Sequence, residues 1–220
     1  LLDLRKAGRI SNYTYKMLNS IDSLCPSFYG LPKIHKPGIP LRSVPSFVNS
    51  PTYAISGYLT RILSPVVGTV KNSCEFADFI KEKAPNAGLD VVSLYAKIPV
   101  NLAVKVAKER LREDASQGQR TSLPMEDIIH LLSFCLKTTQ FVYNGTYYQQ
   151  VSGTDMGSSV SALIANMVME SGTKALASSP VKPFFWKRYV DDVFSAVSAN
   201  EAERLLSQFE FSGALYSIHP

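Results

Sequence analysis

The sequence predicts an α+β fold in which helices cover an antiparallel sheet. Two strand pairs joined by tight turns are indicated, one over residues 140–148 and one over 184–194. Elsewhere, apolar residues recur at the three- and four-residue spacing of amphipathic helices. From residue 89 onward the expected order is strand, helix, helix, hairpin, helix, hairpin, helix. Because hairpins pair antiparallel strands, the sheet is expected to be antiparallel.

Length and composition suit a globular chain. Its 220 residues, 45% of them hydrophobic, can bury the core of one large or two small domains. No apolar run approaches the roughly 20 residues that cross a bilayer, so no membrane partner is expected. Three well-separated cysteines favour a reducing compartment and packing as small apolar residues. The chain lacks an initial Met and a stop signal after its last element, so we expect a fragment of a longer protein.

The net charge of +5 lies in the first quarter of the chain. Residues 1–50 hold 7 Lys and Arg against 2 Asp and Glu, whereas residues 51–220 hold 16 of each. This distribution favours contact between the first quarter and a polyanion, although solubility explains a modest excess equally well.

The first half of the chain alternates helices with extended segments. Residues 1–24 are partly helical, and residues 28–45 are predicted as two short strands around a turn at 36–38. A helix over 55–63 is ended by Pro65. Asn72 and Glu75 have the spacing of a capping box, which predicts a helix through residue 80.

The second half supplies the strands and the longer helices. Residues 89–94 form a short apolar run, typical of a strand covered on both faces. Helices are predicted over 101–113 and over 125–137, the second capped by Ser122. Asn144 and Gly145 predict a type I′ turn between strands. A flexible loop over 153–159 precedes a further helix, and a capping box at 200–203 precedes the last one.

The most distinctive segment is residues 184–194, FFWKRYVDDVF, in which two adjacent carboxylates interrupt an apolar run. The pattern predicts a hairpin with Asp191 and Asp192 at or near its turn. Adjacent buried acids are unfavourable unless a cation offsets them, and carboxylate oxygens are the ligands that Mg²⁺ prefers. A third acid, Asp90, stands on the predicted strand 101 residues earlier. Taken alone, the pair is also compatible with a surface turn.

The wording and order of several motifs resemble the reverse transcriptases of Penelope-like retroelements. Residues 189–192 (YVDD) resemble the Tyr-x-Asp-Asp box, and residues 90–95 (DVVSLY) resemble the motif with the first catalytic Asp. The resemblance covers residues 10–220. Its remaining motifs are 29–36 (YGLPKIHK), 40–42 (PLR), 98–99 (IP) and 156–158 (MGS).

The resemblance implies catalytic and metal-binding roles for the acids. Asp90 and Asp191 would be the main ligands of two Mg²⁺ ions, for which Mn²⁺ can substitute, and Asp192 would support them. The carbonyl of Val91 would be a further ligand. Such ions lower the pKa of an attacking hydroxyl and stabilise the leaving pyrophosphate.

The resemblance also implies a nucleotide site. Lys33 and Arg42 would bind the triphosphate, since a guanidinium suits phosphate oxygens. Tyr95 would exclude a 2′-hydroxyl, provided that the strand ends soon after Asp90, because residues five apart on one strand face opposite sides. Three further residues would line the nucleotide, namely Met156, Gly157 and Tyr189. Two would contact nucleic acid, namely Lys36 and Ser158.

Other interpretations stay open for single residues. Tyr95 could be a core aromatic, and the loop around His35 could simply be solvated. Phe141, Tyr147 and Tyr148 could stack on template bases, although packing is the more ordinary role.

The chain departs from the family pattern at four places. Ala96 and Lys97 replace Thr-Asn, Ser43 replaces a Pro after the motif Arg, and Asp155 replaces a Pro before Met-Gly. A carboxylate at position 155 is expected to disfavour a nearby triphosphate.

The resemblance implies the fingers and palm of a right-hand polymerase. Residues 1–88 would be basic fingers that bind nucleotide and template, and 89–220 the palm with the catalytic acids, with 119–156 open to either part. Family members continue into a thumb and many carry a GIY-YIG endonuclease; neither is expected within this chain.

The implied activity is RNA-directed DNA polymerisation, in which a primer 3′-hydroxyl attacks a deoxynucleoside triphosphate. The partners would be an RNA template, a DNA primer and deoxynucleoside triphosphates, and the location nuclear. Two alternatives stay open: a degenerate non-catalytic remnant that binds nucleic acid or nothing, and an RNA-dependent RNA polymerase. The YVDD box and Tyr95 favour deoxynucleotides over the latter. The oligomeric state does not follow from the sequence.

Overall fold

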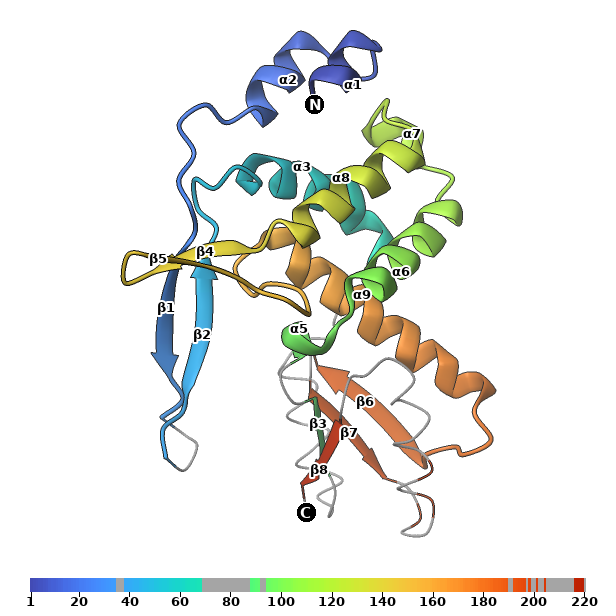
Figure 1. Ribbon diagram of the computed structural model, residues 1–220. Helices are drawn as coiled ribbons and strands as arrows, with labels where there is room; N and C mark the ends of the chain where they lie inside the picture. The colour runs from blue at the N-terminus through green and yellow to red at the C-terminus, as the bar shows by residue number, and fades with distance from the viewer. Residues whose placement is uncertain are drawn as a thin grey trace.

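The computed structural model describes residues 1–34, 38–68, 88–91, 94–189, 192–196, 198, 201, 204 and 216–219. These residues form two four-stranded sheets and a group of packed helices (Figure 1). The helices fill the upper part of the view, one sheet extends to the lower left and the other lies at the bottom, beside α9 (Ser159–Ala175). The predicted combination of helices and sheet is therefore confirmed.

The first sheet joins the N-terminal strands to a hairpin from the middle of the chain. Its order is β2-β1-β4-β5, with β1 (Ser27–Pro32), β2 (Leu41–Ser46), β4 (Gln140–Tyr143) and β5 (Thr146–Gln149). β1 and β2 are antiparallel, as predicted. β1 also runs parallel to β4, with Ser27 opposite Val142. The 140–149 hairpin thus extends the same sheet as the basic N-terminal hairpin.

The turn between β4 and β5 has the predicted geometry. Asn144 and Gly145 both have positive φ, at 47° and 75°. Positive φ at both central residues defines a type I′ turn, whose twist matches that of the flanking strands. The prediction made from the Asn-Gly pair is confirmed.

The second sheet is antiparallel throughout. Its order is β6-β7-β3-β8, with β3 (Gly88–Val91), β6 (Phe185–Tyr189), β7 (Asp192–Ala196) and β8 (Tyr216–His219). β3 is central, between β7 and β8. The 184–194 hairpin is present as β6 and β7. β8 was not predicted from the sequence.

Four helices bury most of the core, namely α3 (Tyr53–Leu63), α6 (Val100–Arg112), α8 (Met125–Lys137) and α9. α8 shows why these segments are helical, because its buried residues recur every three or four positions. They are Ile128, Leu131, Leu132, Cys135 and Leu136. Burial of each large apolar side chain contributes about 1.5–3 kcal/mol. No helix in the described ranges is long and apolar enough to cross a membrane.

Short elements complete the fold. They are α1 (Leu2–Lys6), α2 (Asn12–Leu18), η1 (Ser64–Val66), α5 (Leu94–Lys97), α7 (Gln117–Arg120) and η2 (Leu176–Ser178). α1 and α2 confirm the partly helical N-terminus, and η1 follows α3 where Pro65 was expected to end it.

Some local predictions were wrong. Leu94 was predicted in a strand, but β3 ends at Val91 and Leu94 begins α5. Ser122 was predicted to cap α8, but the N-cap is Pro124, and the Ser122 hydroxyl instead donates to the carbonyl of Arg9 at 3.1 Å. The helices expected after the capping boxes at 72–75 and 200–203 lie outside the described residues.

Cys135 is expected to resist alkylation in the folded protein. It is buried, and burial raises the pKa of its thiol to about 11. Since only the thiolate reacts, about a thousandth of the thiol is reactive at pH 8. Iodoacetamide labelling followed by mass spectrometry should modify the half-buried Cys25 well before Cys135. Labelling of Cys135 at the rate seen in guanidinium chloride would contradict its buried placement.

Candidate active site

The second sheet brings two predicted catalytic positions together. Asp90 of β3 is directly opposite Asp192 of β7, and Asp192 is also opposite Tyr189 of β6. Directly paired Cα atoms of an antiparallel ladder are about 4.5–5.5 Å apart, and paired positions share a face of the sheet. Residues separated by 102 positions in sequence are thus neighbours. Asp191 and Val190, between β6 and β7, lie outside the described residues.

Buried polar contacts join the strand that leads into YVDD to α9 and α6. Arg188 of β6 donates to Asn166 at 2.8 Å and lies 3.8 Å from the carboxylate of Glu170. Arg110 of α6 binds the same carboxylate at 3.0 Å. All three charged side chains are at most 15% exposed, so these contacts are weakly screened and connect β6 to both helices.

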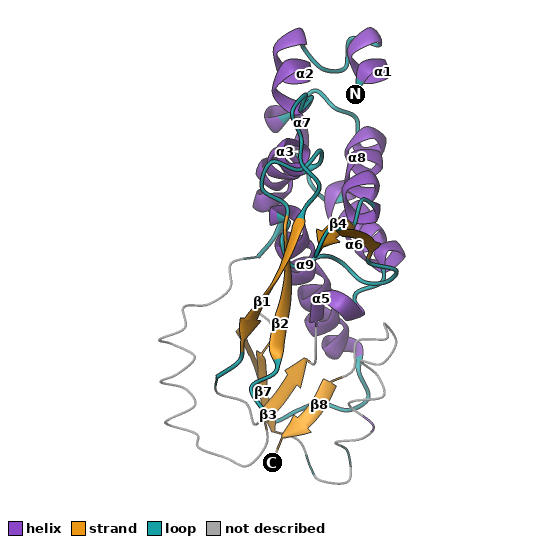
Figure 2. Ribbon diagram, turned by 60° about the vertical axis from the view of Figure 1, so that its left-hand side comes forward, coloured by secondary structure: helices purple, strands orange, loops and turns teal. Residues whose placement is uncertain are grey.

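β3 ends soon after Asp90, which is the condition under which Tyr95 was predicted to exclude a 2′-hydroxyl. β3 ends at Val91 and α5 begins at Leu94, so Tyr95 does not continue the strand alternation that would turn it away from Asp90. Both ribbon views place α5 above β3 (Figures 1 and 2). Tyr95 is half-buried there.

A cavity of about 580 Å³ lies between the first sheet and α5. Four of the six residues predicted to bind the nucleotide line it: Lys33, Arg42, Tyr95 and Met156. Lys33 and Arg42 come from opposite arms of the β1–β2 hairpin, and Tyr95 and Met156 from α5 and the loop before α9. Residues predicted separately from distant motifs therefore share one cavity.

Aromatic rings from the first sheet form a further wall of this cavity. Phe141 stacks on Phe28 at 5.0 Å between ring centroids and on Tyr148 at 5.6 Å, and all three line the cavity. The packing interpretation thus accounts for Phe141. Tyr147, by contrast, is 75% exposed. Phe28 was not among the predicted site residues, although its place in a strand beside other aromatics was a usable signal.

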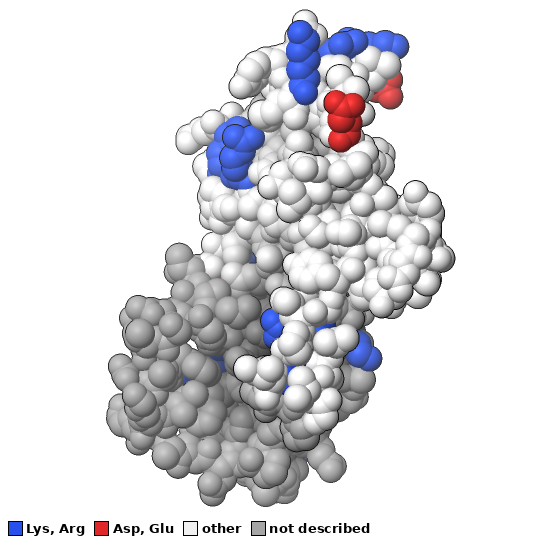
Figure 3. Space-filling model, turned by 90° about the vertical axis from the view of Figure 1, so that its left-hand side faces the viewer, with Lys and Arg blue, Asp and Glu red and all other residues white. Residues whose placement is uncertain are grey.

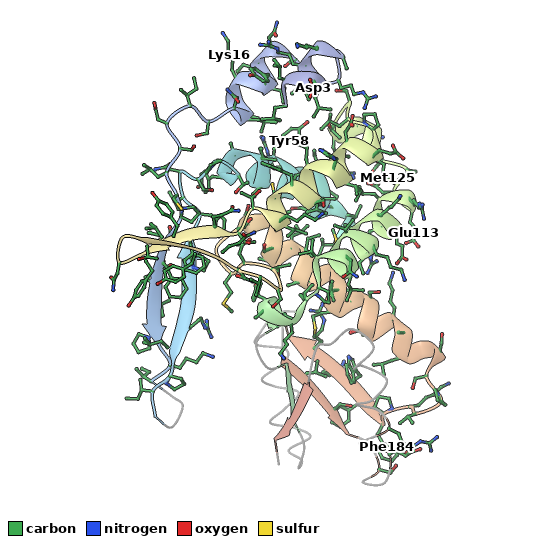
Figure 4. All side chains as sticks on the ribbon, viewed as in Figure 1. Asp3, Lys16, Tyr58, Glu113, Met125 and Phe184 are labelled. Carbon is green, nitrogen blue, oxygen red and sulfur yellow. The ribbon has the colours of Figure 1, made fainter. Side chains whose placement is uncertain are left out.

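Basic side chains stand over the same hairpin. Figure 3 shows Lys and Arg over α1 and α2 at the top and again over the β1–β2 hairpin in the lower half. Among the described residues, no acidic side chain is visible on that lower half of the face. The charges of α1 and α2 are separate from this hairpin, because Asp3 and Lys16 lie at the top of the molecule, above α3 and α8 (Figure 4). The hairpin therefore carries the charge that bears on the site.

The loop over 153–158 is held closely against α5 and β2. Thr154 donates its backbone N–H to the Tyr95 carbonyl at 2.7 Å, and its hydroxyl to the same oxygen at 3.2 Å. Gly153 has φ of +79°, and a Cβ there would overlap the backbone of Ala96. A Cβ at Gly157 would overlap the carbonyl oxygen of Pro45. Glycine is required at both positions because the backbones touch.

The carboxylate of Asp155 is buried against the start of α9 and does not line the cavity. It is 2% exposed, and it is absent from the cavity lining although both its neighbours line the cavity. It accepts hydrogen bonds from the backbone N–H of Gly157 at 3.0 Å and of Ser158 at 2.6 Å. Burial raises the pKa of the Asp155 carboxyl, and these hydrogen bonds oppose the rise. The position of Asp155 therefore does not support the expected repulsion between its carboxylate and a triphosphate in the cavity.

The remaining predicted residues are dispersed. Ser158 is buried, and its hydroxyl donates to Ser56 at 3.1 Å. Gly157 is exposed beside β2, and the Val91 backbone ends β3. Lys36 lies outside the described residues. In the part of the chain that the structure describes, no group of three His, Cys, Asp or Glu side chains could hold a metal ion.

Of the comparisons with known proteins, the one with solved structures finds similar folds. No protein-family model matches the chain, and no curated protein does. The chain is similar to telomerase from Candida albicans, solved with a fragment of telomeric RNA, at 13% identity and a TM-score of 0.61. It is also similar to two structures of apo telomerase from Candida tropicalis, at 16% and 12% identity with TM-scores of 0.55 and 0.58.

These alignments cover 97–99% of this chain but only 45–52% of the telomerase chains. The chain thus spans about half the length of the structures that it matches. The chain therefore shares the fold of the matched half of these telomerase structures. At such identities the likeness concerns the fold alone.

Proposed function

We propose that this chain is the fingers and palm of an RNA-directed DNA polymerase of the Penelope-like retroelement class. The observation that carries the proposal is the direct pairing of Asp90 with Asp192. Acidic residues from two distant motifs occupy paired positions of one sheet, and α5, which begins three residues after β3 ends, lines a cavity together with two basic residues. A reverse transcriptase needs both features, an acidic centre and a nearby triphosphate site.

The cavity residues would position a deoxynucleoside triphosphate. Lys33 and Arg42 would hold the phosphate oxygens by charge-assisted hydrogen bonds. The ring of Tyr95 would occupy the space of a ribose 2′-hydroxyl. Met156 and Gly157 would line the base and the sugar. Orientation of this kind can supply several kcal/mol of catalysis, because the reacting atoms no longer have to find one another.

The acidic centre has the donor chemistry of a magnesium site. Two carboxylates at paired strand positions, with Asp191 next to one of them in sequence, provide the hard oxygen ligands that Mg²⁺ requires. Bound there, Mg²⁺ would supply positive charge that lowers the pKa of a primer 3′-hydroxyl and stabilises departing pyrophosphate. Asp90, Asp191 and Asp192 would hold the ions, and the Val91 carbonyl would assist.

The proposed partners are an RNA template, a DNA primer and deoxynucleoside triphosphates. The Candida albicans telomerase was solved with a telomeric RNA fragment, which supports an RNA partner here. The exposed Arg42 and the half-buried Lys33 on the β1–β2 hairpin add a basic surface of the kind that nucleic acid favours. Retroelement polymerases act on chromosomal DNA, so we propose a nuclear location.

Primer extension tests the proposal. The natural full-length protein should extend oligo(dT) on poly(rA) with dTTP when Mg²⁺ or Mn²⁺ is present, and should use UTP poorly. Asp191→Ala is the control for contaminating polymerases. Extension no greater than that of Asp191→Ala would refute the enzyme, and equal use of UTP would favour an RNA polymerase.

A further inference from the structure

A buried carboxylate organises the turn that carries Met156. Asp155 sits just before α9, and besides the two backbone amides it accepts a hydrogen bond from the Ser161 hydroxyl at 3.0 Å. Three donors thus surround a charge that is almost completely removed from water. Unpaired, such a charge would cost several kcal/mol, whereas hydrogen bonds from two backbone amides and a hydroxyl stabilise it. The turn over 155–158 is therefore closed by this side chain.

The closed turn is joined to its surroundings on several sides. Ser158 bonds to Ser56 of α3, and the Thr60 hydroxyl of α3 donates to Ser159 at 3.1 Å. Thr154 is bonded to the carbonyl of Tyr95, and Gly157 abuts the backbone of β2. Met156 is the residue of the turn whose side chain lines the cavity, and it is 37% exposed.

We infer that Asp155 is a positioning residue of the nucleotide site. Its carboxylate holds the turn so that Met156 keeps its place in the cavity wall. This inference rests on the proposed function, because it takes the cavity to be the site of a deoxynucleoside triphosphate. Asp155 itself does not touch the nucleotide, because it faces α9.

Two substitutions separate the hydrogen bonds from the charge. Asp155→Ala leaves the amides of Gly157 and Ser158 and the Ser161 hydroxyl without an acceptor. Asp155→Asn retains a carbonyl oxygen for the two amides at nearly the same size. Loss of buried acceptors costs about 1–3 kcal/mol each, so Asp155→Ala should raise the KM for dTTP about tenfold or more. Asp155→Asn should restore the KM to within about threefold of the wild type.

A matched control is available in Asp114. Its carboxylate also closes a turn, accepting hydrogen bonds from the backbone N–H of Ser116 at 2.9 Å and from Arg120. It lies between α6 and α7 and does not line the cavity. Asp114→Ala should lower the melting temperature and leave the KM for dTTP unchanged. An unchanged KM in Asp155→Ala, or an equal increase in both variants, would overturn the inference.

Hydrogen exchange provides a readout that does not need activity. The amides of Gly157 and Ser158 should be protected in the wild type and in Asp155→Asn, and exchange at least about tenfold faster in Asp155→Ala. If the wild type extends no primer, the proposed function fails, yet equal protection in all three proteins would still refute the positioning role. Should Asp155→Ala not fold, Ser161→Ala removes a single donor and should raise the KM about threefold. No increase there would contradict the inference.

Discussion

Asp90→Asn is expected to lower the rate of primer extension about a thousandfold. The substitution keeps the size of the side chain and removes its negative charge, at the position paired with Asp192. Charge stabilisation at a magnesium-dependent centre is worth several kcal/mol, and ~4 kcal/mol corresponds to about 10³ in rate. Single-turnover extension of oligo(dT) on poly(rA) at saturating dTTP measures the effect on kcat directly.

The same assay distinguishes a shared site from two separate ones. Asp90→Asn and Asp192→Asn should each reduce the rate, and the double variant should be much less impaired than the product of the two effects, because residues that act as a unit are not additive. Glu113→Gln is the matched control, since Glu113 is exposed at the C-terminal end of α6, remote from the second sheet (Figure 4). Full additivity, or loss of activity in Glu113→Gln, would argue against a joint acidic centre.

Tyr95→Ala is expected to admit ribonucleotides. Tyr95 lines the cavity together with Met156, and α5 holds it just after the end of β3. Removing the ring opens space for a 2′-hydroxyl, so the preference for dTTP over UTP should fall about a hundredfold. The quantity to measure is the ratio of kcat/KM for the two nucleotides on the same template and primer.

Tyr95→Phe serves as the control for this effect. It retains the ring and removes only the hydroxyl, so discrimination should stay within about threefold of the wild type. A loss of discrimination in Tyr95→Phe would assign selectivity to a hydrogen bond of the hydroxyl. Unchanged discrimination in Tyr95→Ala would remove the steric role altogether.

Short sequence patterns correctly predicted the elements whose conformation is decided by residues close together in the sequence. Asn144 and Gly145 both have positive φ, a conformation that Asn and Gly adopt at a lower energetic cost than most residues. The type I′ turn could therefore be predicted from this pair. The helices α6 and α8 were predicted to within a residue at their start, since their apolar spacing leaves one continuous buried face. Ser122 was wrongly predicted as the cap because Pro124 is the N-cap of α8, and the Ser122 hydroxyl donates to the carbonyl of Arg9 instead.

The effect of Asp155 could not be predicted from the sequence. A carboxylate beside a nucleotide motif predicts repulsion of the triphosphate. The sequence gives the charge of a side chain but not the direction in which that side chain points. In the folded chain, Oδ1 accepts from Gly157 and Ser158, and Oδ2 accepts from Ser161. The side chain is thus turned into α9. Only the position of α9 against α3 and β2 makes that orientation the favourable one.

The amino-acid sequence by itself determined the hairpin of residues 184–194, the long helices and the chemical type of the predicted site residues, since each depends on spacing within one segment. The tertiary structure alone decided that Asp90 is paired with Asp192 and that Lys33 and Arg42 share a cavity with Tyr95 and Met156. The physical reason is that strand register and packing between helices come from burial of apolar side chains over the whole chain. No local pattern specifies which distant segments that burial brings together.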